Sequence, residues 1–243
     1  STTDTRDGRS CTFLSAARQG HSATLLDDGR VFIAGGERIN TASSTYWETT
    51  EIYDPRNGLF SNGPTMGGWT RKAHTATKLL DGRVLLVGGI GLGDDTETTW
   101  RVAQIYEPSA KTFLPPIQQR DQRAYHTATL LEDGRVLLVG GTYGNLVLST
   151  TEIFDPATLS FSYGPVLREP RSHHRTVRVG PATVAVIGGR GSGQALATVE
   201  FVTVGQASTV QGPELDEARS YFAAVVVPNM NAIVVAGGFA SLV

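Results

Sequence analysis

Cysteine and long apolar runs are scarce in this sequence of 243 residues. The one cysteine, Cys11, rules out an intramolecular disulfide, so the redox compartment stays open and the localisation is unknown. No apolar run reaches the roughly 18 residues of a membrane-spanning helix, and no signal peptide is recognisable. The chain begins with Ser1, which would suit an exported mature protein or part of a longer chain. A net charge of −2 gives no global field that would draw the chain to nucleic acid.

Double glycines that end short apolar runs recur five times along the chain. They are separated by 53, 52, 48 and 49 residues, and the runs before them read VFIA, VLLV, VLLV, VAVI and IVVA. Short β-branched runs without polar alternation indicate strands that are buried on both faces. The five pairs are Gly35–Gly36, Gly88–Gly89, Gly140–Gly141, Gly188–Gly189 and Gly237–Gly238.

Each repeat has further fixed features, which predict four strands and no helix. An Asp-Gly pair between the first two strands, as at Asp28-Gly29, predicts a two-residue hairpin turn. The third strand reads TEIYDP, AQIYEP, TEIFDP or VEFVTV, and a later phenylalanine at position 60, 113 or 161 marks a fourth, outer strand. Four strands in about 50 residues is the spacing of a β-propeller blade.

The two ends of the chain complement each other. The last repeat stops at Val243 after two strands, whereas Ser1–Asp4 and Phe13 align with the third and fourth strands of another repeat. Pairing the ends within one blade would remove unpaired edge strands, which invite aggregation. We therefore predict a velcro closure, in which N-terminal strands complete the C-terminal blade. A fragment of a larger ring is the alternative.

Units that read R-x-x-H-x-A-T, an apolar strand, Gly-Gly and a later Tyr/Phe-Asp-Pro resemble kelch repeats, over essentially the whole chain. The resemblance implies an all-β fold, here a five-bladed β-propeller of four-stranded antiparallel blades. The chain is then expected to be one domain, residues 1–243. Its blades would cover residues 14–61, 62–114, 115–162 and 163–211, with a composite fifth blade of residues 212–243 and 1–13.

An arginine lies 17 residues before the first glycine of four pairs and 18 residues before that of the fifth. At the start of each inner strand, these side chains are expected to ring the mouth of a central channel and to capture an anion. In some kelch domains, arginines at this point of the repeat bind acidic peptides. The alternative is that they brace loops through acids such as Asp54, Glu107 or Asp155. The five are Arg18, Arg71, Arg123, Arg171 and Arg219.

Aromatic residues break the repeat in the loops that follow the first three double glycines. Trp47 and Trp100 occupy equivalent positions in the two long loops, residues 37–50 and 90–103, and Tyr143 lies in the shorter third loop. Such side chains can stack on sugars or anchor peptides. We assign these three, with the arginines, to a candidate ligand site; packing across the loops is the alternative.

A histidine precedes each of the first four glycine pairs by 14 residues. A ring of imidazoles could bind zinc, but the repeat places no carboxylate beside them, and a packing role is the preferred interpretation. The sequence therefore predicts no metal site and no cofactor. The four are His21, His74, His126 and His174, while His173 is an extra histidine to which no function is assigned.

These features favour a non-catalytic interaction module, expected to be a monomer, that recognises an acidic peptide or protein partner at the channel mouth. No catalytic residue can be singled out, so an enzyme is left open but not preferred. The loop tryptophans would suit a carbohydrate-binding, lectin-like propeller instead. An enzyme acting on acidic sugars, such as a mutarotase or lyase, would need an asymmetric acid–base pair. An isolated propeller from a larger protein would have an architectural role.

Overall fold

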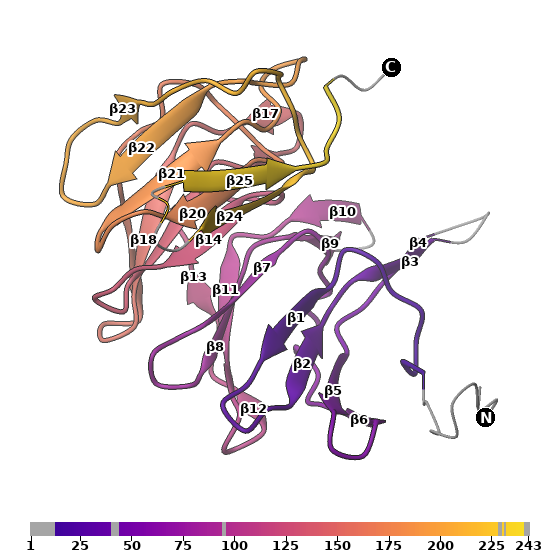
Figure 1. Ribbon diagram of the computed structural model, residues 1–243. Helices are drawn as coiled ribbons and strands as arrows, with labels where there is room; N and C mark the ends of the chain where they lie inside the picture. The colour runs from indigo at the N-terminus through magenta and orange to yellow at the C-terminus, as the bar shows by residue number, and fades with distance from the viewer. Residues whose placement is uncertain (1–12, 40–43, 94–95, 228–229, 231, 241–243) are drawn as a thin grey trace. The chain divides into compact units, whose positions relative to one another are not determined.

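The structure, a computed structural model, describes residues 13–39, 44–93, 96–227, 230 and 232–240, and it divides into two compact units, residues 1–116 and 117–243. All regular elements of the described residues are strands (Figure 1). No described segment forms a helix with the length and hydropathy needed to cross a lipid bilayer. The all-β prediction is confirmed.

The first unit contains two antiparallel sheets with the same strand order, β1-β2-β5-β6 and β7-β8-β11-β12 (Figure 1). In each sheet the second strand is the apolar run before a double glycine, and it is almost completely buried. Its strands are β1 (Ser22–Leu25), β2 (Val31–Ala34), β5 (Thr50–Asp54), β6 (Leu59–Asn62), β7 (Thr75–Lys78), β8 (Val84–Val87), β11 (Val102–Glu107) and β12 (Thr112–Phe113).

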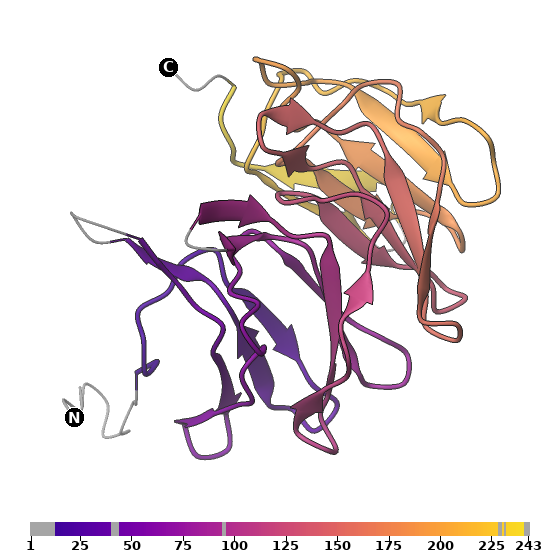
Figure 2. The same ribbon diagram turned by 180° about the vertical axis from the view of Figure 1, so that it is seen from behind.

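The second unit repeats this order in the four-stranded sheets β14-β15-β18-β19 and β20-β21-β22-β23 (Figure 2). A short strand, β13 (Ile117–Gln118), lies beside β19. The four-stranded antiparallel sheets of the prediction are thus present. They consist of β14 (Thr127–Leu130), β15 (Val136–Val139), β18 (Thr151–Asp155), β19 (Ser160–Tyr163), β20 (Arg175–Arg178), β21 (Thr183–Ile187), β22 (Val199–Thr203) and β23 (Val210–Gln211).

The fifth repeat forms a two-stranded sheet of β24 (Ala223–Val227) and β25 (Ala232–Ala236) in the described part of the chain. Residues 1–12, which the sequence predicts to supply its other strands, lie outside the described residues. Five blades, the velcro closure and the single-domain boundaries therefore stay predictions.

The segments after the first three double glycines form hairpins rather than irregular loops. Each hairpin starts directly after its second glycine. The hairpins pair β3 (Glu37–Ile39) with β4 (Ser44–Tyr46), β9 (Ile90–Gly93) with β10 (Thr96–Thr99), and β16 (Thr142–Tyr143) with β17 (Leu146–Val147).

The Asp-Gly turns differ from the predicted two-residue form. The N–H of Leu26 donates to the carbonyl of Arg30 at 2.8 Å, and the N–H of Gly29 donates to the carbonyl of Leu26 at 3.1 Å. Three residues are therefore enclosed, and of these only Gly29 has a positive φ, +83°. This is a type I turn with a glycine bulge. The Asp28 carboxylate stabilises it by accepting from the N–H and Nε of Arg30 at 3.0 and 2.7 Å.

Apolar side chains of neighbouring sheets form the core of each unit. In the first unit, Phe32 of β2 stacks on Tyr106 of β11 with ring centroids 4.1 Å apart. In the second unit, Leu137 and Val139 of β15 pack with Val184 and Val186 of β21. The second and third strands of adjacent sheets thus supply the core, and the second strands are the buried β-branched runs of the sequence.

The double glycines join consecutive repeats. The carbonyl of Gly35 accepts from Nη1 of Arg18 at 2.8 Å, and the N–H of Gly36 donates to the carbonyl of Arg71 in the next repeat at 2.7 Å. A Cβ on Gly35 would lie 2.3 Å from that same Arg71 oxygen. Glycine is needed here because the backbones of two repeats meet closely and because φ is +65°.

Candidate functional site

Four of the five predicted ligand-binding arginines are buried. The side chains of Arg18, Arg123 and Arg171 are 0% exposed, and Arg71 as a residue is 0% exposed. Each reaches from the start of its inner strand to the carbonyl of the first glycine of its pair, at 2.6 to 3.1 Å. These guanidinium groups lie inside the sheets rather than at a surface.

Arg123 shows how three of these groups are neutralised. Its Nη2 lies 2.7 Å from Oε1 of Glu152 on the third strand, and both side chains are 0% exposed. The Glu152 carboxylate also accepts from the backbone N–H groups of Arg120 and Asp121, at 2.8 and 3.0 Å. A buried ion pair is retained when hydrogen bonds satisfy its remaining lone pairs. Arg18–Glu51 and Arg171–Glu200 repeat the pair, each at 2.7 Å.

Arg71 has a neutral partner in the same place. Its Nη2 donates to Oε1 of Gln104 at 2.8 Å, and Nε2 of Gln104 donates to the carbonyl of Met66 at 3.1 Å. With no carboxylate beside it, burial lowers the pKa of Arg71 to about 9. The glutamine side chain suits this site because its NH₂ group donates to a carbonyl of the loop before Arg71. The corresponding loops of other repeats present N–H groups, from which a carboxylate accepts.

With these contacts the arginines brace the repeat. The acids that pair with them are not Asp54, Glu107 or Asp155, which the sequence suggested. Asp54 instead bonds Arg56 within its turn, at 2.6 Å. Arg219 differs from the others: its side chain is 26% exposed, and it bonds the Gly237 carbonyl at 3.1 Å and Glu217 at 3.4 Å. Ligand contact by the five arginines stays a prediction, and Arg219 is the member of the set with an accessible guanidinium group.

The predicted aromatic residues take three different roles in their loops. Trp100 is partly buried: its Nε1 donates to the Thr70 carbonyl at 2.6 Å, and its ring meets Trp69 edge-on with centroids 4.8 Å apart. Trp47 donates from Nε1 to the Ala17 carbonyl at 3.2 Å. Tyr143, on β16, is 50% exposed. The equivalent residues of the next two repeats are Leu148 and Leu196, so the described repeats do not share one aromatic pocket.

A polar cluster in the first unit was not anticipated from the sequence. Nζ of Lys72 lies 2.8 Å from Oε2 of Glu37 and 3.5 Å from Oε1 of Glu97. Tyr46 donates to the same Glu97 carboxylate, and its ring lies 4.9 Å from the Lys72 ammonium. The pKa of Lys72 is raised by its hydrogen bonds to Glu37 and Tyr46, against the opposing effect of burial, and burial raises that of Tyr46. Both pKa values are therefore shifted further above pH 7, whereas general acid–base catalysis needs a pKa near the working pH.

The repeated histidines pack between sheets. Nε2 of His74 lies 2.8 Å from Oγ of Ser22 in the preceding repeat, and Nε2 of His174 lies 2.8 Å from Oγ1 of Thr127. Burial lowers the pKa of His74 to about 3 and that of His174 well below its ordinary value. Phe222, which replaces histidine in the fifth repeat, is equally buried. In the described part of the chain, no three His, Cys, Asp or Glu side chains are grouped so that they could hold a metal ion.

The position before the repeated histidine, which in the fifth repeat is the position before Phe222, forms a feature that sequence reasoning missed. In the second unit this position holds Tyr125, His173 and Tyr221, and their rings stack in a row with successive centroids 4.2 Å apart. All three have positive φ, between 51° and 58°. The signal was present in the sequence, because three consecutive repeats place an aromatic ring where the first repeat has Gly20. We name this set the aromatic row.

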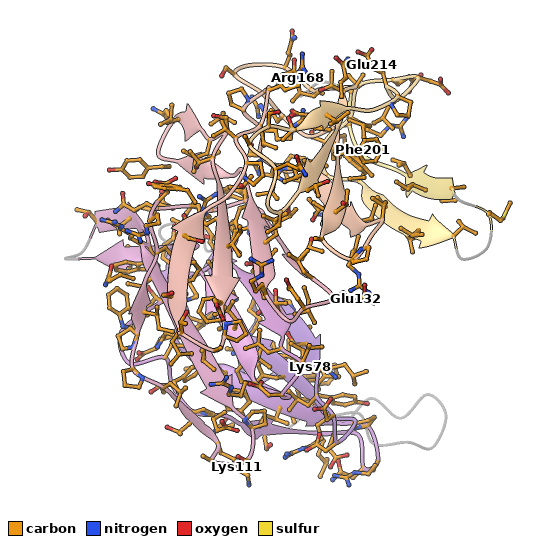
Figure 3. All side chains as sticks on the ribbon, turned by 90° about the vertical axis from the view of Figure 1, so that its left-hand side faces the viewer. Lys78, Lys111, Glu132, Arg168, Phe201 and Glu214 are labelled. Carbon is orange, nitrogen blue, oxygen red and sulfur yellow. The ribbon has the colours of Figure 1, made fainter. Side chains whose placement is uncertain are left out.

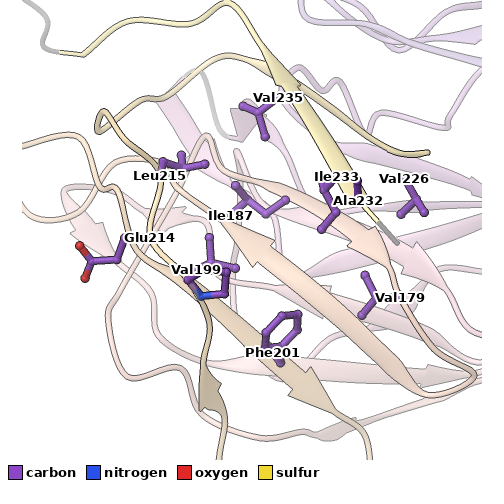
Figure 4. Close-up of a pocket in the computed structure, with 11 residues that line it drawn as sticks. Val179, Ile187, Val199, Phe201, Glu214, Leu215, Val226, Ala232, Ile233 and Val235 are labelled. Carbon is purple, nitrogen blue, oxygen red and sulfur yellow. The ribbon is translucent and has the colours of Figure 1, made fainter. Parts of the chain in front are cut away.

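A cavity of about 410 Å³ lies between β22 and the β24–β25 hairpin (Figure 4). Its walls are apolar, and they include Phe201 of β22 and Ile233 of β25. Glu214, which is also labelled in Figure 3, is its charged lining residue among those the structure describes. The carboxylate of Glu214 would repel an acidic ligand, so this cavity does not suit one.

Comparison with known proteins places these repeats. No protein-family profile matches the chain. An F-box/kelch-repeat protein of Arabidopsis thaliana is 27% identical over 135 residues, which are 51% of this chain and 28% of that protein. The F-box/kelch-repeat protein SKIP4 of the same plant is 25% identical over 134 residues, 49% of this chain and 34% of its own.

Two further similarities concern an enzyme and a solved structure. Galactose oxidase of Gibberella zeae is 40% identical over 96 residues, 38% of this chain and 14% of the enzyme. The chain thus spans about a third or less of the length of these relatives. The solved structure of YjhT matches 94% of this chain and 75% of the YjhT chain. The TM-score is 0.73 at 14% identity, which shows a shared fold.

Proposed function

We propose that this chain, which belongs to the kelch-repeat β-propeller family, is a non-catalytic module that binds an acidic protein partner. The observation that carries the proposal is a division of labour within the repeat. Four of the five recurring arginines are buried and hydrogen-bonded, whereas Ile39, Tyr143 and Leu146 on the variable hairpins are exposed. Recognition by a repeat protein falls on exposed, variable residues held by a rigid scaffold.

Exposed apolar side chains gather on the hairpins after the double glycines. In the second unit, Tyr143 is 50% and Leu146 is 60% exposed on the β16–β17 hairpin. In the first unit, Ile39 on β3 is 62% exposed. Apolar residues in exposed loops are a usual anchor for a protein partner. The F-box/kelch-repeat relatives are consistent with such a role.

The preference for acidic partners is supported by arginine chemistry. Arg219 keeps part of its guanidinium group accessible, and its ion-pair partner Glu217 is 75% exposed and weakly placed at 3.4 Å. A partner carboxylate can replace such an exposed contact at little cost, because a surface ion pair contributes only about 0–1 kcal/mol.

The catalytic and lectin alternatives gain less support from the geometry. In the Lys72 cluster, Lys72 is paired with Glu37, and its pKa is shifted further above pH 7, away from the range that acid–base catalysis needs. The face of Trp100 is covered edge-on by Trp69, which reduces its use as a platform for sugars. The similarity to galactose oxidase covers only 38% of the chain.

Isothermal titration with short peptides rich in Asp and Glu tests the proposal, with the same peptides carrying Asn and Gln as the comparison. We expect the parent to bind the acidic peptides and not the amide peptides. Arg219→Ala and Leu146→Ser should each weaken binding by about tenfold, the loss expected when one charged or anchoring contact is removed.

Arg135→Ala is the matched control, because Arg135 is likewise an exposed arginine paired with an acid, Asp133, but within a turn. It should bind as the parent does. Equal affinity for acidic and amide peptides, or an equal loss in the Arg135 variant, would refute the acidic preference.

A further inference from the structure

In the aromatic row, both faces of the central imidazole are covered by phenol rings. Tyr125 and Tyr221 both lie with centroids 4.2 Å from the imidazole of His173, at interplanar angles of 30° and 36°. Two rings at this distance and tilt must cover opposite faces of the imidazole. The edge of an aromatic ring is the positive end of its quadrupole. The edges of the stacked rings therefore favour an anion over a cation.

Backbone strain accompanies the row. Tyr125, His173 and Tyr221 have φ values of 53°, 51° and 58°, in the left-handed region that bulky side chains avoid. Gly20 occupies the same position of the first repeat with φ +66°, so glycine meets the backbone requirement without strain. The N–H of Tyr221 donates to the His173 carbonyl at 3.2 Å, and that of His173 to the Tyr125 carbonyl at 3.1 Å. Ala73 has φ +53° at this position of the second repeat, so the left-handed conformation belongs to the repeat, and the row places bulky rings on it.

Hydrogen-bonding capacity is left unused along the row. Nδ1 of His173 lies 3.0 Å from Oγ of Ser172, whereas its Nε2 is buried and has no hydrogen-bond partner among the described residues. The hydroxyl groups of Tyr125 and Tyr221 also lack a described partner. Buried polar atoms without partners are rare in folded proteins. Tyr221 is 47% exposed, so a ligand can approach this end of the row.

A positive charge lies beside the row. Arg190 forms a reciprocal pair of backbone hydrogen bonds with Ser172, at 2.7 and 2.9 Å, which places it next to His173. Burial raises the pKa of Tyr221, and the charge of Arg190 opposes that rise. Burial, with a smaller contribution from the charge of Arg190, lowers the pKa of His173 to about 4. The imidazole is therefore neutral at pH 7 and can donate or accept a hydrogen bond.

We propose that the aromatic row binds a carboxylate side chain of the protein partner, with the Tyr125 and Tyr221 hydroxyls and Arg190 as its contacts. This assignment rests on the proposed function for the class of partner, and it places the acidic contact on residues that no repeat motif marks. His173 is the positioning residue that holds the two phenol rings apart.

Titration of the acidic and amide peptides against row variants tests this assignment. The double variant Tyr125→Phe/Tyr221→Phe keeps the stacked rings and removes only the hydroxyls. We expect it to lose more than tenfold in affinity for the acidic peptide, because two hydrogen bonds to a charged group are removed, with an unchanged melting temperature. Tyr221→Gly should lose at least as much affinity, and it should keep or gain stability because the strain is relieved.

Leu159→Gly is the matched control. Leu159 has φ +52° in the turn between β18 and β19, is partly exposed, and belongs to the same unit. Its replacement relieves the same kind of strain away from the row and should leave affinity unchanged.

The outcomes separate the two proposals. Acidic peptides that bind all row variants as tightly as the parent, yet bind Arg219→Ala or Leu146→Ser weakly, would overturn the row and leave the proposed function standing. No binding of any acidic peptide to the parent would overturn both. Binding of free glucuronate without binding of peptides would keep the carboxylate chemistry but reject a protein as its source. A fall in melting temperature for the Phe pair without a change in affinity would assign the row to packing alone.

Discussion

The guanidinium group of Arg123 and the carboxylate of Glu152 meet at 2.7 Å, with neither side chain exposed to solvent. The pair connects the start of the inner strand of a sheet to its third strand, and two backbone N–H groups complete the carboxylate's hydrogen bonds. Arginine thus acts as an internal strut at a position where the sequence alone predicts a ligand contact.

Glu152→Gln should destabilise the protein by about 3 kcal/mol, because it leaves the buried guanidinium group with only the longer, 3.4 Å contact to the partly exposed carboxylate of Asp121. It also turns an amide NH₂ towards backbone donors. Chemical denaturation would measure the free energy of unfolding. Glu132→Gln, at an exposed turn position, is the control and should change stability by no more than about 0.5 kcal/mol. Equal effects would show that the Arg123 pair carries no special weight.

Gly141→Ala should cost about 3 kcal/mol, the sum of a strained backbone and an overpacked contact. A Cβ there would lie 2.6 Å from the Ala124 carbonyl oxygen, and φ is +103°. Gly144→Ala separates the two effects, since Gly144 has φ +54° but no atom within 4 Å of the position that a Cβ would take. We expect its cost to be about half as large by the same denaturation measurement. Similar costs at both sites would mean that the close approach is relaxed easily.

His74→Phe should reduce the loss of stability in acid. The unfolded chain protonates His74 near its ordinary pKa of 6.5, but the folded protein does so only near pH 3, because burial lowers the pKa. Unfolding therefore takes up a proton between these values, and stability falls as the pH drops through this window by up to about 1.4 kcal/mol per pH unit.

The phenyl ring fits this position because Phe222 occupies it in the fifth repeat, where its Cε1 approaches Gly188 as Cε1 of His74 approaches Gly35. As the pH is lowered from 8 to 3, the melting temperature of the variant should fall less than that of the parent. Parallel curves across that range would show that His74 does not remain neutral in the folded protein.

Thr3→Pro tests the velcro closure, which concerns residues outside the described range. Thr3 aligns with Thr151, which pairs with Val139 in a central strand, where proline is not tolerated. Gly8 aligns with Pro156 in the turn that follows, so Gly8→Pro is the matched control. We expect a clear fall in melting temperature for Thr3→Pro and none for Gly8→Pro. Equal melting temperatures for the two variants would argue that the N-terminal segment is not part of a sheet.

The strands and the double glycines could be predicted from the sequence because their causes are local or repeated. A buried β-branched run reads as a strand wherever it occurs, and the close approach of Gly36 to Arg71 recurs in later repeats. The sequence correctly predicts a turn at Asp28-Gly29, but the predicted two-residue type is wrong. The hydrogen bond between Leu26 and Arg30 decides that the turn encloses three residues.

The sequence by itself determined the repeat. It predicted the strands of each repeat, their order along the chain, and the positions that recur. What only the tertiary structure decided was the exposure of those positions. A recurring arginine reads alike at a surface and in a core, and its burial depends on an acid 29 residues further along, as Arg123 depends on Glu152. The aromatic row required the structure for the same reason, since residues 48 apart become neighbours only when adjacent sheets pack.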